Sequence, residues 1–173
     1  MYSVDRNDIV AQLGDIPRPS GGAPLPALVA TDGALLLAYL GGMETPDSSG
    51  APISVSGDTR GSLVRIRFIR PRSHMFGGPN DETLAGHPLY DRGLRHYAAY
   101  EVTSSSWVRS LEKINSVHPQ HSKGMFQDCR HIIITFHDST FECVADGYAV
   151  STHNGSRRSA LLEMARIIGD DLA

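Results

Sequence analysis

Residues 130–152 read Arg-His-Ile-Ile-Ile-Thr-Phe-His-Asp-Ser-Thr-Phe-Glu-Cys-Val-Ala-Asp-Gly-Tyr-Ala-Val-Ser-Thr, and this stretch decides the fold that we expect. Residues 132–136 are β-branched or aromatic, and such side chains fit the pleated surface of a sheet. Asp138-Ser139 and Asp146-Gly147 are turn-forming pairs. The stretch therefore predicts three consecutive antiparallel strands joined by two tight hairpins.

Side chains alternate between the two faces of a strand, so the predicted pairing sorts this stretch into two faces. The first turn places residue 135 opposite residue 142, and the second places residue 143 opposite residue 150. The predicted core face is apolar and carries Ile132, Ile134, Phe136, Phe141, Cys143, Ala145, Tyr148 and Val150. The other face gathers polar side chains at one end, namely Thr135, His137, Thr140, Glu142, Ser151 and His153.

Two imidazoles and a carboxylate at that end are groups that bind a metal ion or transfer a proton. The alternative is that this face is the water-exposed side of a half-buried sheet. The strand spacing also separates His137 and His153 by roughly 10 Å at the backbone, which is wide for two ligands of one ion. The catalytic hypothesis therefore names His137 as acid or base, assisted by Asp138, Glu142 or His87, and assigns no metal site.

The length of 173 residues fits a single domain, 1–173, with a core large enough to fold without disulfides. The net charge of −3 argues against binding to nucleic acid or to an anionic membrane. We find no run of about 18 apolar residues that predicts a spanning helix, and no features of a secretory signal. Cys129 and Cys143 are expected to be unpaired thiols, which fits a cytoplasmic location.

Shorter patterns complete the expected fold. They predict a short helix within 1–13, a hairpin over 27–40, a short strand at 53–55, strands over 63–70 and 96–102, a helix after Ser104–Ser106, and a last helix over about 157–168. Together these elements predict an α+β domain. Its mainly antiparallel sheet would have about six or seven strands, with two main helices packed on one face.

The segment 71–93 has neither helical nor strand periodicity, and loops of this length in compact domains are functional or disordered. Asn80, Asp81 and Glu82 offer oxygen ligands or a general base, so we predict that they bind a ligand. The alternative is that these side chains satisfy the loop's own backbone groups. A joint site requires them to lie within about 10 Å of His137 and Glu142.

Two further groups of residues are weaker candidates. Arg65 and Arg67 alternate on a predicted strand and are candidate ligands for an anion, since guanidinium groups suit carboxylate and phosphate. The alternative is a solvated strand face with acidic neighbours. His118 and His121 have a spacing that zinc sites tolerate, but no cysteine cluster accompanies them, and we assign no metal to the pair.

Three segments of the chain resemble a family of small, uncharacterised bacterial proteins. They are Phe-Gly-Gly-Pro-Asn-Asp-Glu (76–82) with Gly-His-Pro-Leu-Tyr (86–90), Tyr-Glu-Val through Trp107 (100–107), and Phe-His-Asp-Ser-Thr-Phe-Glu-Cys (136–143). The resemblance covers roughly residues 63–145. It implies no activity, cofactor or catalytic residue.

Three hypotheses for function follow. The first is a module that binds a small-molecule or protein partner through the 71–93 loop and the polar end of 130–152. The second is a small enzyme, such as a metal-assisted hydrolase or lyase, that uses His137. The third is a structural or regulatory homo-oligomer, such as a homodimer, that has no site of its own and associates through the apolar stripe of the last helix. No phosphate loop, dinucleotide-binding glycines or serine elbow is present, which favours the first hypothesis and leaves the cofactor unassigned.

Overall fold

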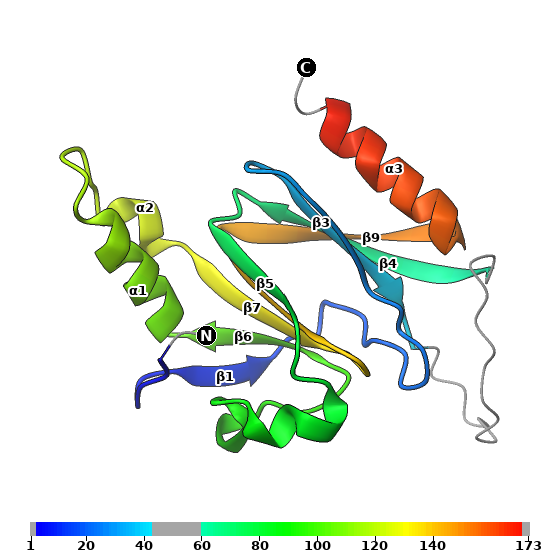
Figure 1. The fold of residues 1–173 in the computed structure, drawn as a ribbon, viewed down its shortest axis with the longest axis horizontal. Helices are drawn as coiled ribbons and strands as arrows, with labels where there is room; N and C mark the ends of the chain where they lie inside the picture. Colours follow the sequence, from blue (N-terminus) through cyan, green and yellow to red (C-terminus); the bar gives the residue numbers. More distant parts are fainter. Residues whose placement is uncertain (1–2, 43–59, 171–173) are drawn as a thin grey trace.

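The computed structural model describes residues 3–42 and 60–170, and these form an α+β fold with two antiparallel sheets (Figure 1). The five-stranded sheet has the order β1 (Ile9–Gln12), β6 (Ala99–Thr103), β7 (Arg130–Thr135), β8 (Thr140–Ala145) and β5 (Ser73–Gly77). The four-stranded sheet has the order β2 (Ala27–Ala30), β3 (Leu35–Leu40), β4 (Arg60–Ile69) and β9 (Gly147–Ser156). The predicted α+β class is confirmed, although the described strands number nine and are divided between two sheets. The prediction that both main helices pack on one face is wrong, because each sheet carries one of them.

Five helical segments accompany the sheets, and two of them are α-helices longer than seven residues. The helical segments are η1 (Asp81–Gly86), η2 (Tyr90–Arg92), α1 (Ser106–Asn115), α2 (Gly124–Gln127) and α3 (Arg157–Asp170). Ser105 caps α1 by accepting a hydrogen bond from the Val108 N–H, as the sequence predicted for this serine run. None of the helices that the structure describes is long and apolar enough to cross a membrane.

The hairpin of β7 and β8 forms as predicted, with its register moved by two residues. Ile133 pairs with Glu142 and Ile134 pairs with Phe141. The connection is a four-residue turn, 136–139, in which the Phe136 N–H donates to the Ser139 carbonyl at 2.8 Å. Because the shift is an even number of residues, every side chain keeps its predicted face, and the inward residues of both strands are buried.

The third predicted strand joins the other sheet, so the expected three-stranded meander is wrong. β9 pairs with β4 along ten residues, with Tyr148 opposite Phe68 and Val150 opposite Ile66. Two contacts explain the change of sheet. The open edge of β8 is occupied by β5, a strand that the sequence did not indicate, and the Asp146 N–H bonds to the Ile69 carbonyl at 2.9 Å.

The two sheets enclose the main hydrophobic core between their inner faces. The rings of Phe68 and Phe141 lie 5.2 Å apart across this interface, and those of Tyr39 and Phe136 lie 5.3 Å apart. Aliphatic side chains from β3, β4 and β7 fill the space around them. The alternation of β4 and β7 thus buries one apolar face from each sheet, as expected for stacked antiparallel sheets.

The outer face of each sheet is also covered, and the two long helices lie on opposite sides of the molecule (Figure 1). Met164 and Ile168 of α3 pack on Leu36 and Ala38 of the four-stranded sheet. On the five-stranded sheet, Trp107 of α1 makes an edge contact with the His131 ring at 5.0 Å. The 71–97 segment covers the rest of that face with Leu84, Leu89 and Leu94, which pack against Tyr100, Val102 and Ile133.

The predicted helix within 1–13 is wrong, because residues 9–12 form strand β1 at the edge of the five-stranded sheet. Val10 faces the apolar cluster under the 71–97 segment, whereas Ile9 points outward and is exposed. A helix this short is marginal without packing, whereas the edge of β6 offers backbone partners. The short strand expected at 53–55 lies outside the described residues.

We predict that Phe141→Ala lowers the free energy of unfolding by about 3–5 kcal/mol, because it empties a fully buried site between the sheets. The matched control is Phe76→Ala, which removes a neighbouring ring that is 42% exposed and should cost about 1 kcal/mol or less. Urea unfolding of both variants measures the difference. Equal losses would show that the core does not lie between these sheets.

Candidate functional site

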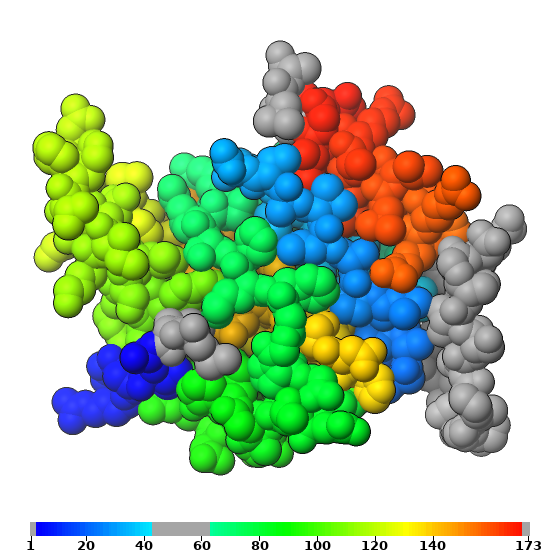
Figure 2. Space-filling model, viewed as in Figure 1, coloured from blue at the N-terminus to red at the C-terminus, as the bar shows by residue number. Residues whose placement is uncertain are grey.

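The outer face of β7 and β8 carries the polar side chains that the sequence singled out, and most of them are buried. His131, Thr135, Thr140 and Glu142 lie beneath the 71–97 segment and α1, whereas His137 reaches the surface at the hairpin turn. Figure 2 shows this hairpin, in yellow and gold, emerging beside the green 71–97 segment. The expectation that this face points to bulk water is therefore wrong along most of its length.

At the turn, three side chains form what we call the His137 cluster: His137, Asp81 and Tyr97. The Nδ1 atom of His137 lies 2.7 Å from Asp81 Oδ2. The Tyr97 hydroxyl donates to the same carboxylate oxygen at 2.5 Å and lies 3.0 Å from His137 Nδ1. The Tyr97 and His137 rings are nearly parallel, with their centroids 6.5 Å apart.

Backbone contacts hold the His137 cluster in place. The Asp81 N–H donates to the His137 carbonyl at 2.9 Å, and the Thr140 hydroxyl donates to the Pro79 carbonyl at 2.9 Å. Asn80 caps η1, since its side chain accepts hydrogen bonds from the backbone and hydroxyl of Thr83. Asp81 therefore begins η1 directly against the hairpin. The Asn80 side chain therefore satisfies a backbone group of its own loop, at Thr83, which is the alternative to ligand binding that the sequence left open.

The electrostatics of the cluster favour a protonated imidazole. Hydrogen bonding to Asp81 raises the pKa of His137 above its ordinary value, and the nearby Asp138 and Glu82 carboxylates act in the same direction. Hydrogen bonds from Tyr97 and His137 lower the pKa of Asp81. Burial and the Asp81 carboxylate raise the pKa of Tyr97 to about 12, so this hydroxyl stays protonated and acts as a donor.

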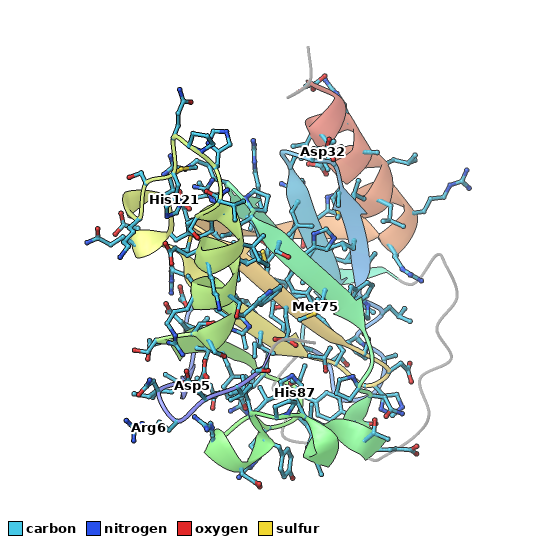
Figure 3. All side chains as sticks on the ribbon, turned by 60° about the vertical axis from the view of Figure 1, so that its left-hand side comes forward. Asp5, Arg6, Asp32, Met75, His87 and His121 are labelled. Carbon is cyan, nitrogen blue, oxygen red and sulfur yellow. The ribbon has the colours of Figure 1, made fainter. Side chains whose placement is uncertain are left out.

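A second group, the Glu142 relay, is buried below the first: His87, Glu142, His131 and Ser105. The Glu142 carboxylate lies between two imidazoles, with His87 Nε2 at 3.2 Å from Oε1 and His131 Nε2 at 3.0 Å from Oε2. His131 Nδ1 lies 2.9 Å from Ser105 Oγ. Figure 3 shows His87 at the edge of the 3-10 segment, where its side chain reaches toward the sheet.

The contacts of the relay determine where its protons lie when the imidazoles are neutral. The Leu89 N–H donates to His87 Nδ1 at 3.1 Å, so His87 carries its proton on Nε2 and donates it to Glu142. A carboxylate only accepts, so His131 also donates from Nε2. His131 Nδ1 is then an acceptor, and the Ser105 hydroxyl donates to it.

The candidates of the expected joint site are divided between the two groups. His137 lies in the turn that follows β7, whereas Glu142 pairs with Ile133 within the sheet. Asp81 meets His137, and His87 meets Glu142. Asp138 lies only at the margin, with its carboxylate 3.9 Å from His137 Nε2 and its side chain 88% exposed.

The remaining candidates lie away from the His137 cluster. Arg65 sits on the outer face of the other sheet, where it pairs with Glu163 at 2.6 Å, and Arg67 lies two residues further along the same strand face. His153 is on β9, where it contacts Glu163 and Ser159, so the predicted placement of His153 on the same sheet face as His137 is wrong. Glu82 is exposed beside Asp81 and contributes charge alone.

Two candidate metal ligands bind other protein groups. His121 lies between Glu112 and Asn115, at 2.8 and 3.0 Å, and His118 accepts a hydrogen bond from the Gln120 backbone. Within 3–42 and 60–170, no three His, Cys, Asp or Glu side chains are arranged to hold a metal ion.

Three residues of these groups were not among the sequence candidates. His131 was on the correct face by alternation, and Ser105 was recognised as a helix cap, but neither pattern predicts their contact. Tyr97 fell in the strand predicted over 96–102, but β6 begins only at Ala99, and the Tyr97 backbone is left-handed, with φ of 53°. Such strain in a residue other than glycine is found where the surrounding structure imposes it, often at functional sites.

Comparison of the chain with protein-family models, with curated proteins and with solved structures gave no match.

We predict that Glu142→Ala lowers the free energy of unfolding by about 3–5 kcal/mol, because it leaves two buried imidazoles without their acceptor. The control is Glu101→Ala, which breaks a partly exposed pair with Arg130 and should cost about 1 kcal/mol or less. Chemical denaturation compares the two. A smaller loss for Glu142→Ala than for Glu101→Ala would contradict the structural role of the relay.

We also predict that Asp81→Asn lowers the pKa of His137, because the carboxylate that stabilises the imidazolium is removed. An NMR titration of the histidine ring protons measures the pKa directly. Asp138→Asn serves as the control and should lower the pKa less, since Asp138 lies further away and in water. An unchanged pKa in Asp81→Asn would show that the 2.7 Å contact does not exist in solution.

Proposed function

We propose that the protein binds a small neutral or cationic ligand at the His137 cluster and exchanges a proton with it through His137 Nε2. The observation that supports this proposal is the fixed orientation of one exposed imidazole. Nδ1 is held by Asp81, the His137 side chain is 45% exposed, and the nearest carboxylate to Nε2 is 3.9 Å away, beyond hydrogen-bond length.

The chemistry that this arrangement supports is general acid–base catalysis. A ligand hydroxyl or a ligand-bound water gives its proton to Nε2, and Asp81 stabilises the imidazolium that forms. The raised pKa moves the titration of His137 toward neutral pH, where a group of this kind accepts and returns a proton most effectively. Tyr97 donates to the carboxylate and keeps Asp81 ionised.

The charge around the cluster defines the class of ligand. Asp81, Glu82 and Asp138 all raise the pKa of His137, so the potential at this surface is negative. An anionic ligand would be repelled there, whereas a neutral molecule or an amine is accepted.

A binding module that performs no reaction is the second candidate. Within the described part of the chain, His137 contacts Asp81, Tyr97 and Asp138, and none of these is a serine or cysteine nucleophile. An imidazole that has no nucleophile beside it also suits the reversible binding of a ligand hydroxyl or amine without any reaction. The acid–base catalyst and the binding module use the same surface, and they differ only in whether the bound ligand is chemically converted.

NMR screening of histidine-labelled protein separates them. The panel contains neutral aryl esters, lactones and primary amines, and its readouts are the His137 ring signals and the appearance of product. We expect hits that move the His137 signals. For a reactive hit, His137→Gln should lower kcat/KM by about 10²–10⁴, the usual contribution of a general acid or base.

His118→Gln is the control, since His118 is an exposed histidine on another surface. A ligand that binds at His137 but yields no product supports the binding module. A panel in which no ligand moves the His137 signals would contradict both candidates. Turnover of a ligand that does move the His137 signals, if His137→Gln leaves it unchanged, would contradict the catalytic candidate.

A further inference from the structure

The Glu142 relay ends at a pocket that the proposed function does not use. The pocket has a volume of about 400 Å³ and lies where β6 meets α1 and α2. Its lining includes Ser105, Glu101, Arg109, Phe126 and Cys129. A cavity of this size lies within the range that holds small organic ligands.

Ser105 is presented to this pocket by a sharp connection between a strand and a helix. β6 ends at Thr103, Ser104 has a left-handed backbone with φ of 50°, and α1 begins at Ser106. A strained strand-to-helix turn is also how hydrolases with a serine elbow present their nucleophile. The position at the first turn of α1 adds the positive end of the helix dipole, which stabilises negative charge that develops nearby.

The environment of Ser105 differs from that of an ordinary helix cap. Its hydroxyl donates to His131 Nδ1 at 2.9 Å and accepts from the Val108 N–H at 3.3 Å. The His131 side chain is fully buried, and Glu142 accepts from its other nitrogen at 3.0 Å. A serine, an imidazole and a carboxylate in sequence form the arrangement that activates a serine nucleophile, and here Nδ1 of the imidazole, in place of Nε2, faces the serine.

We propose that Ser105 is the nucleophile of a second site, which hydrolyses small esters with a short acyl group in the β6–α1 pocket. Ser105 Oγ forms a bond to the acyl carbon while its proton passes to His131 Nδ1. The C–O bond to the alcohol then breaks, and the alcohol leaves with that proton. Water attacks the acyl-serine by the same route, which releases the carboxylic acid and restores Ser105.

Within this site, Glu142 stabilises the His131 imidazolium that forms in each step. His87 is a positioning residue, because it acts only through its hydrogen bond to Glu142 Oε1. The inference does not rest on the His137 proposal, since no contact of the His137 cluster is needed for the relay or for the pocket.

The experiment treats the full chain with an alkyl fluorophosphonate, which phosphonylates an activated serine and releases fluoride together with the serine proton. Mass spectrometry of the tryptic digest then locates the adduct. We expect it on the peptide that spans residues 96–109, with fragment ions that assign it to Ser105. The same protein should hydrolyse p-nitrophenyl acetate with an initial burst, because the acyl-serine accumulates.

Two variants and one control complete the design. Ser105→Ala should lose the adduct and the burst, and Glu142→Gln should slow labelling by at least about 100-fold, since the imidazolium loses its partner. Ser110→Ala, on the same helix and outside the pocket lining, should label as the wild type does. The wild-type measurement does not depend on whether a variant folds. Absence of an adduct, or an adduct on other serines that persists in Ser105→Ala, overturns the proposal.

Discussion

The contact on which the polar architecture depends is the Glu142 carboxylate held between two buried imidazoles. A buried carboxylate loses its hydration and is stable only where donors replace the water. His87 supplies one donor from the 71–97 segment, and His131 supplies another from the start of β7. One side chain therefore fastens the segment to the sheet and also orients the imidazole beside α1. Apolar packing holds the 71–97 segment against the sheet, and the hydrogen bond from His87 to Glu142 fixes its position there.

The β7–β8 hairpin carries one imidazole at the start of β7 and another at its turn, and their opposite environments separate the two proposed sites. His137 lies at the surface among carboxylates, where its protonated form is favoured. His131 lies fully buried, with a serine on one nitrogen and a carboxylate on the other. The same residue type is therefore suited to exchange protons with a ligand from solvent at one end and to activate a neighbouring hydroxyl at the other.

Local patterns predicted much of the fold. The alternation in 132–136 and 141–145 correctly assigned the core face, and the turn pairs at Asp32-Gly33 and Asp138-Ser139 correctly located two hairpins. The patterns did not predict strand pairing between segments that are far apart in the sequence. β5 lacks a clear alternating pattern, and once it occupies the edge of β8, the strand β9 must pair with β4 instead. That choice removed His153 from the face that carries His137.

For the candidate sites, the sequence by itself determined which side chains share the outer face of β7 and β8, because the period of two in a strand is a local property. It also indicated Asp81, His87, His137 and Glu142 as residues of interest. Only the tertiary structure decided that Asp81 meets His137, that His87 and His131 share Glu142, and that Ser105 completes the relay. Those contacts join segments that are far apart in the chain, and they arise from the docking of the 71–97 segment and α1 on the sheet, which no local pattern encodes.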